Sequence, residues 1–181
     1  MTEQTIKPQS LIMRYGLYLG LLNIVMGVLT YISGAQTSGN ALLGGIISAV
    51  SLILMAVIIV AAIREYKKAN DGYLLLGQAI KIGLGVALIG GIISVLYTYV
   101  FTTYIEPEYM QQILDAQLEK MLQDSPQMTQ AQLDAAREMA TRFSSPMITM
   151  AFGLISSLFL GFIISLITGA VLQKKSPEQQ L

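Results

Sequence analysis

One apolar stretch, residues 147–172, constrains the fold of this chain more than any other feature. It carries no charged side chain and lies between Pro146 and the pair Lys174-Lys175. A helix of this length rises about 39 Å, enough to cross a hydrocarbon layer of about 30 Å with room for tilt. Small residues recur inside it at every fourth position: Gly153, Ser157, Gly161, Ser165 and Gly169. Such a stripe lets a second helix approach closely within lipid, so the stretch predicts a membrane helix that packs against another helix.

Shorter stripes of small residues occur in other apolar stretches, as Gly16 and Gly20, as Gly45 and Ala49, and as Gly83, Ala87 and Gly91. Because four residues overshoot one helical turn, five positions at this spacing drift by about 160° in all. A single straight partner follows that drift only at a steep crossing angle; otherwise two neighbours share the stripe. Two interpretations stay open, namely packing within one bundle and a face for a homodimer or another membrane protein.

Three further apolar stretches predict transmembrane helices over residues 11–33, 41–63 and 81–104. Only 12% of the 181 residues are charged, about half the share in soluble domains. The first stretch also has features of a signal peptide, with a cleavage-like Ser33-Gly34-Ala35. Its apolar run over residues 17–32 is longer than the usual apolar region of about 7–15 residues. We therefore predict that it is retained as a helix.

The start of the third helix is ambiguous. Residues 73–104 as one helix would span about 48 Å, too long for a simple crossing. Either the helix projects from the membrane, or residues 73–80 lie at the interface and the crossing begins near Lys81, which would extend its ammonium group to the headgroups. We favour the second arrangement.

Lysine and arginine counts predict the orientation. With both termini in the cytoplasm, including tails over residues 1–10 and 173–181, the inner side holds eight basic residues and the outer side three. The inner set is Lys7, Arg14, Arg64, Lys67, Lys68, Lys81, Lys174 and Lys175, and the outer set is Lys120, Arg137 and Arg142. This asymmetry fits the positive-inside rule.

The one long polar segment, residues 105–146, then lies outside the cytoplasm. Apolar residues recur at helical spacing in its first half, and Ser125-Pro126 interrupts the pattern. Thr129 with Gln132 predicts a capping box that opens a second helix. The predicted fold is therefore an all-α membrane protein with four transmembrane helices and an extracytoplasmic amphipathic helical hairpin between helices 3 and 4.

Candidate chemistry is sparse, because the chain has no Cys and no His. Thiolate nucleophiles, imidazole bases and ordinary zinc sites are thereby excluded, and we expect no enzyme activity, cofactor or metal. Glu106 and Glu108 do not share a helix face and are explained by a solvated helix start. Asn23 is the most polar side chain at membrane depth. It is predicted either to contact a ligand or to form a hydrogen bond between helices. Four basic residues on the inner side either bind anionic lipid headgroups or only contribute to the orientation of the protein in the membrane. They are Arg64, Lys67, Lys68 and Lys81.

Two sequence motifs carry a family resemblance. Residues 70–74 read NDGYL and 77–83 read GQAIKIG, and YIEPE follows at 104–108. On these motifs and the four-span layout, roughly residues 10 to 175 resemble a bacterial inner-membrane family known as domain of unknown function 4199. The resemblance implies an integral inner-membrane protein without an established activity or catalytic residues, and it would make residues 105–146 periplasmic.

The function expected from these observations is that of a non-enzymatic accessory or scaffold subunit that packs against another membrane protein or itself. The alternative is a small carrier or flippase for a lipid-linked or small substrate, acting with a lipid-phosphate glycosyltransferase by analogy. The expected partners are the lipid bilayer, anionic headgroups and a membrane protein. A net charge of zero gives no reason to expect nucleic acid.

Overall fold

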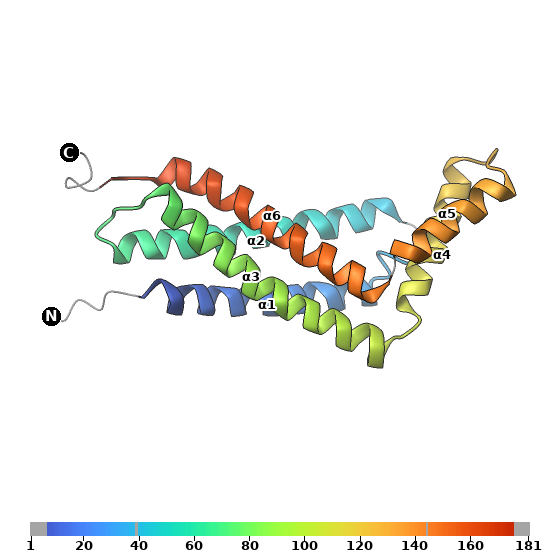
Figure 1. The fold of residues 1–181 in the computed structure, drawn as a ribbon, viewed down its shortest axis with the longest axis horizontal. Coiled ribbons are helices and arrows are strands. Elements are labelled where there is room, and N and C mark those ends of the chain that lie inside the picture. The colour runs from blue at the N-terminus through green and yellow to red at the C-terminus, as the bar shows by residue number, and fades with distance from the viewer. Residues whose placement is uncertain (1–6, 39, 144, 176–181) are drawn as a thin grey trace.

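The computed structural model describes residues 7–38, 40–143 and 145–175. The protein is a bundle of long helices with a shorter helical hairpin at one end, and the start of α1 and the end of α6 lie at the other end (Figure 1). The elements are α1 (Pro8–Ile32), α2 (Ala41–Ala69), α3 (Leu76–Val100), the π-helical turn η1 (Phe101–Ile105), α4 (Tyr109–Asp124), α5 (Gln130–Phe143) and α6 (Pro146–Leu172). Within the described residues, four helical segments are long and apolar enough to cross a membrane: α1, α2, α3 with η1, and α6. The predicted all-α fold with four such helices is confirmed.

Helix ends differ from the predicted boundaries. The first helix begins at Pro8, so residues 8–10 of the predicted tail are helical, and the second continues to Ala69. Residues 1–6 and 176–181 of the predicted tails lie outside the described residues. The third helix begins at Leu76, five residues before the predicted crossing at Lys81. Residues 76–80 are therefore helical and continuous with α3, and their place at the membrane interface stays a prediction.

Local hydrogen bonds explain this early start. The turn after α2 has Gly72 at φ 80°, a conformation that glycine adopts without strain. The side-chain amide of Asn70 donates to the Tyr73 carbonyl at 3.0 Å. The Gln78 side chain then accepts from the Leu75 N–H at 2.9 Å, satisfying one of the unpaired donors at a helix start. The sequence of the turn thus favours a helix that starts directly after it.

The C-terminal end of the chain is tied to this turn. The backbones of Leu74 and Lys174 exchange two hydrogen bonds of 2.8 and 2.9 Å, an isolated antiparallel bridge. The Lys67 ammonium donates to the carbonyl of Leu172, the last residue of α6, at 2.8 Å. A cation at this position offsets the negative end of the helix dipole.

The third helix is the centre of the bundle and packs against α1 on one side and α6 on the other (Figure 1). Fully buried side chains gather in the half of the bundle that holds the start of α1 and the end of α6, among them Leu19, Ile59, Ile63, Ile82 and Val86. Toward the hairpin the described helices bury few large side chains. The bundle is therefore tightly packed at one end and hollow at the other.

A π-turn and a helical hairpin form the hollow end. In η1 the N–H of Glu106 donates to the carbonyl of Phe101, five residues earlier, at 2.8 Å. Within the hairpin, the predicted capping box is confirmed, since Thr129 and Gln132 exchange side-chain to backbone bonds of 2.9 and 3.3 Å. An ion pair across the hairpin joins Arg137 of α5 to Asp115 of α4 at 3.3 Å.

Candidate binding cavity

The predicted small residues of α6 face α3. Four of them meet small residues of α3 in antiparallel order: Ser157 with Gly91, Gly161 with Ala87, Ser165 with Gly83, and Gly169 with Ala79. A Cβ atom on Gly83 would lie 2.3 Å from Ser165 Cβ, and one on Gly161 would lie 2.5 Å from Ala87 Cβ. Ordinary carbon contacts are about 3.5–4.0 Å, so a larger residue would push the helices apart.

The predicted small residues of α1 also face α3. A Cβ atom on Gly16 would lie 2.5 Å from Ile89 Cβ, and one on Gly20 would lie 2.5 Å from Ile93 Cδ1. Residue numbers rise together on α1 and α3 along these contacts, so the two helices run in the same direction. This is expected, because α2 returns the chain across the bundle between them. The close approaches are thus made between helices of the same chain.

Gly153 of α6 and Gly45 of α2 are the exceptions among the predicted small residues. No atom lies within 4 Å of a Cβ placed on either. For Gly153 the physical reason is a gap between α3 and α6 beyond Ser157, where Gly153 and the α3 residues Gly91 and Ser94 line a small cavity. Gly153 also lines a cavity between α1, α2, α3 and α6.

This cavity, which we call the inner chamber, has a volume of about 500 Å³. It reaches from the start of α2 down to Met55, 14 residues along that helix, or about 21 Å at 1.5 Å per residue. Its wall is neutral and polar over much of its length. The polar lining residues are Asn23, Thr30, Gln36, Ser48, Ser51, Ser94, Ser156 and Ser157.

Several of these polar groups have no hydrogen-bond partner in the part of the chain that the structure describes. Within the described residues, no hydrogen bond involves the side chain of Asn23, Ser48, Ser94 or Ser156. None of their polar atoms is both buried and unsatisfied, so they remain accessible from the chamber. Asn23, predicted either as a ligand contact or as a bond between helices, makes no such bond here and lines the chamber. The chamber therefore offers free amide and hydroxyl groups to a molecule that enters it.

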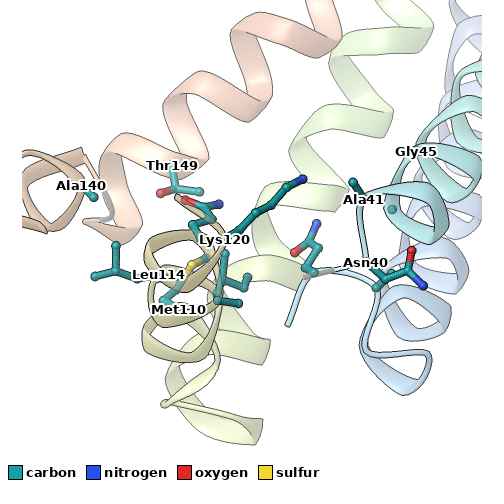
Figure 2. A pocket seen from close by; sticks show the side chains of 14 residues that line it. Asn40, Ala41, Gly45, Met110, Leu114, Lys120, Ala140 and Thr149 are labelled. Carbon is teal, nitrogen blue, oxygen red and sulfur yellow. The ribbon is translucent and has the colours of Figure 1, made fainter. Parts of the chain in front are cut away.

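A second cavity, the outer chamber, lies between the hairpin and the helix ends of the bundle and measures about 550 Å³ (Figure 2). It adjoins the inner chamber, because Ala35, Gln36 and Gly44 line both. Met110 and Leu114 of α4 form its apolar wall (Figure 2). Lys120 extends across it from α4 and is the one charged side chain of its described lining. The two chambers together form a path from the hairpin into the bundle.

An aromatic cluster fixes the root of the hairpin beside this path. The rings of Tyr31, Phe101 and Tyr109 pack edge to face with centroids 5.1–5.4 Å apart. The Tyr31 hydroxyl donates to the Glu106 carboxylate at 2.7 Å, and the Tyr109 hydroxyl donates to Gln36 at 3.2 Å. Burial of the Tyr109 ring raises the pKa of its phenol above the ordinary value of 10.0. Glu106 is thus a structural anchor for the joint rather than merely a solvated helix start.

The opposite end of the bundle holds the predicted headgroup cations, which the structure does not bring together. Lys67 is occupied with the α6 carboxyl end, whereas Arg64, Lys68 and Lys81 are exposed. Another basic residue, Arg14, pairs with Glu65.

That pair forms a small polar cluster between α1 and α2. The guanidinium of Arg14 donates to one carboxylate oxygen of Glu65, and the hydroxyl of Tyr15 donates to the other at 2.7 Å. Glu65 is not among the predicted residues, although it is the one acidic residue close after the second apolar stretch. An acidic residue so close to the end of an apolar stretch was the sequence feature that could have predicted an ion pair at the helix ends.

The described lining of the two chambers is neutral apart from Lys120. Among the described residues, no group of three or more Asp, Glu, His or Cys side chains could hold a metal ion. The described lining residues of the two chambers include no carboxylate. Lys120 was predicted only as an outer cation and the chamber serines Ser48, Ser94 and Ser156 were not predicted at all. The signal for these serines was their hydroxyl groups within otherwise apolar helices.

Four apolar helices of membrane-crossing length, enclosing a neutral polar cavity, define a multi-pass integral membrane protein. The family described as "Protein of unknown function (DUF4199)" matches residues 14–174, and the chain belongs to this family. The match confirms the resemblance carried by the motifs at residues 70–83 and 104–108. No curated protein and no solved structure matches the chain.

Proposed function

We propose that the protein resides in the bacterial inner membrane with both termini in the cytoplasm and the hairpin in the periplasm. The eight-to-three distribution of basic residues supports this orientation. The arrangement of the bundle is compatible with it, because the start of α1 and the end of α6 lie opposite the hairpin (Figure 1).

The absence of Cys from the chain makes a direct test simple. Single variants Ser125→Cys in the hairpin and Lys175→Cys at the C-terminal end are treated in intact spheroplasts with a membrane-impermeant maleimide. The hairpin cysteine should react at once and the C-terminal cysteine only after permeabilisation. The reverse pattern would refute the orientation.

We propose that this protein is a non-enzymatic carrier that takes an amphipathic molecule into the cavity from the periplasmic side. The observation that carries this proposal is the hollow half of the bundle, in which Asn23, Ser94 and Ser156 present unpaired polar groups at membrane depth. Unpaired polar groups within a membrane are costly unless they face water or a ligand. The packed end, with its bridge between Leu74 and Lys174, closes the path on the other side.

The experiment is lipid transfer in proteoliposomes. Fluorescent NBD-labelled phosphatidylglycerol is placed in both leaflets, and dithionite added outside reports how much label crosses. Gly153→Phe should abolish transfer, because its side chain would extend into the open space of the inner chamber. Gly77→Phe is the matched control, since this helical glycine of α3 also has open space around it and lines neither chamber. Transfer equal to that of empty vesicles would refute the carrier function.

A second candidate is the accessory or scaffold subunit. The small residues of α1, α3 and most of α6 no longer argue for it, because they pack within the chain, whereas Gly45 and Ala49 of α2 are exposed. It is favoured instead by the apolar surface of the hairpin, where Met139 is 64% exposed and Met121 and Leu122 are 39% exposed. A pull-down from native membranes tests it, with Met139→Glu expected to release a partner. Recovery of the chain alone would count against this candidate.

A further inference from the structure

Lys120 occupies an unusual position at the mouth of the cavity. It belongs to α4, yet it lines the outer chamber together with Ala41 and Gly44 from the first turn of α2 and Thr149 from the first turn of α6. The ammonium group therefore extends to the level at which two membrane helices begin (Figure 2). In a bilayer this level is that of the lipid headgroups.

The charge of Lys120 has no opposite charge paired with it in the described parts of the chain. Within the described residues, Lys120 takes part in no ion pair or hydrogen bond. Its neighbour Glu119 does not line the outer chamber, although both residues line a smaller pocket beside Thr37 and Ser38, and no ion pair joins them. The start of α2 adds a partial positive charge on the same side. A partly buried cation beside a neutral wall favours an anionic partner at this point.

Amide groups beside Lys120 are suited to the same partner. The Gln36 side chain accepts from Tyr109 through its carbonyl oxygen, so its NH₂ group remains a donor. Gln117 also lines the outer chamber and makes no hydrogen bond within the described residues. One ammonium group with two amide donors suits the oxygens of a phosphate ester.

The inner chamber indicates what kind of molecule would carry a phosphate bound at Lys120. Between α2 and α6 its lining is open to the side, where Leu52 is 44% and Leu160 is 36% exposed. In a membrane this opening faces acyl chains. A molecule with a phosphate at Lys120 can therefore enter laterally with its apolar part within the bilayer.

We propose that Lys120 binds the phosphate of an anionic lipid from the outer leaflet, whose apolar part occupies the opening between α2 and α6. This proposal rests on the carrier function and names its substrate class. The same phosphate chemistry is offered by a soluble phosphate ester, which the experiment separates from a lipid.

The test measures the thermal midpoint of the full chain in detergent micelles as phosphatidylglycerol, phosphatidylcholine or glycerol 3-phosphate is titrated. A ligand that binds only the folded chain raises the midpoint according to its affinity. Phosphatidylglycerol should stabilise more strongly than the other two. Lys120→Gln should weaken its apparent affinity about fivefold to tenfold, the effect expected for one basic residue at the headgroup level. Lys120→Arg should retain the affinity.

The control is Lys175→Gln, an exposed cation beyond the opposite end of the bundle that is not among the predicted headgroup contacts, which should behave as wild type. Equal stabilisation by phosphatidylcholine, or loss of affinity in Lys175→Gln rather than Lys120→Gln, would overturn the proposal. Stabilisation by glycerol 3-phosphate equal to that by the lipid would overturn the lipid assignment. These outcomes are separate from failure of the carrier function, because binding is measured without any transfer between leaflets.

Discussion

A close contact between α3 and α6, that of Gly161 with Ala87, allows a quantitative test of the packing. A methyl group added by Gly161→Ala would lie 2.5 Å from Ala87 Cβ and 3.4 Å from the carbonyl oxygen of Gly83. Relief requires the helices to separate by about 1 Å, since carbon atoms approach to about 3.5–4.0 Å. Overpacking of this kind costs about 1–3 kcal/mol, whereas replacing Gly by Ala inside a helix gains up to about 1 kcal/mol.

The matched control is Gly153→Ala, because it lies two steps along the same stripe with no atom within 4 Å. The helix-propensity gain is common to both variants and cancels in the comparison. Gly161→Ala should therefore be less stable than Gly153→Ala by about 1–3 kcal/mol. Unfolding by SDS in mixed micelles, followed by circular dichroism, gives both free energies of unfolding.

The double variant Gly161→Ala with Ala87→Gly moves the methyl group from one helix to the other. It should recover most of the lost free energy of unfolding, since only one Cβ then occupies the contact. Independent, additive effects of the two substitutions would show that the two residues do not touch. Equal stability of Gly161→Ala and Gly153→Ala would refute the close contact itself.

Polar contacts give three further predictions. Glu65→Ala should lower the thermal midpoint, because it removes the partner of Arg14. Glu65→Gln should lower the midpoint less, since an amide oxygen still accepts a hydrogen bond. Equal midpoints for wild type and both variants would contradict this prediction. Lys67→Met should lower the free energy of unfolding by about 0.3–1 kcal/mol through loss of the bond to Leu172, and chemical denaturation that leaves it unchanged would be evidence against the cap. Because the folded chain holds the Tyr109 phenol proton more tightly than the unfolded chain, its contribution to stability is full below pH 10 and declines as pH rises from there through the raised pKa. Tyr109→Phe should show a shallower alkaline decline in midpoint than wild type, and identical pH profiles would count against the burial of this ring.

Local sequence patterns were sufficient for the helices. An uncharged run as long as residues 147–172 has few alternatives to a membrane helix, and Thr129 with Gln132 specified a cap through neighbours three residues apart. The start of α3 was harder, because it depends on the backbone of the turn at Asn70 and Gly72. Hydropathy alone left that start open.

Contacts between distant residues were predictable only in part. The stripe on α6 indicated a close helix partner, but spacing along one helix does not name the partner or the point at which the two diverge. Gly153 and Gly161 are equivalent in the sequence pattern, but only Gly161 lies in close contact with α3.

The cavity was the least predictable feature, since a hollow is a property of several helices at once. Asn23 was apparent as a polar residue at membrane depth, yet its accessibility depends on residues of α2, α3 and α6. Lys120 looked like one of three outer cations in the sequence. Its role as a candidate ligand contact arises from the folding of α4 over the ends of α2 and α6.

The π-turn at residues 101–105 has a consequence for how the hairpin is aimed. A π-turn holds one more residue than the α-helical turn it replaces, and one residue corresponds to about 100° of rotation about the helix axis. Deleting one residue within η1 would swing α4 around that axis, part Glu106 from Tyr31 and carry Lys120 off the cavity mouth. The chain length at this joint therefore determines whether the hairpin covers the cavity or leaves it uncovered.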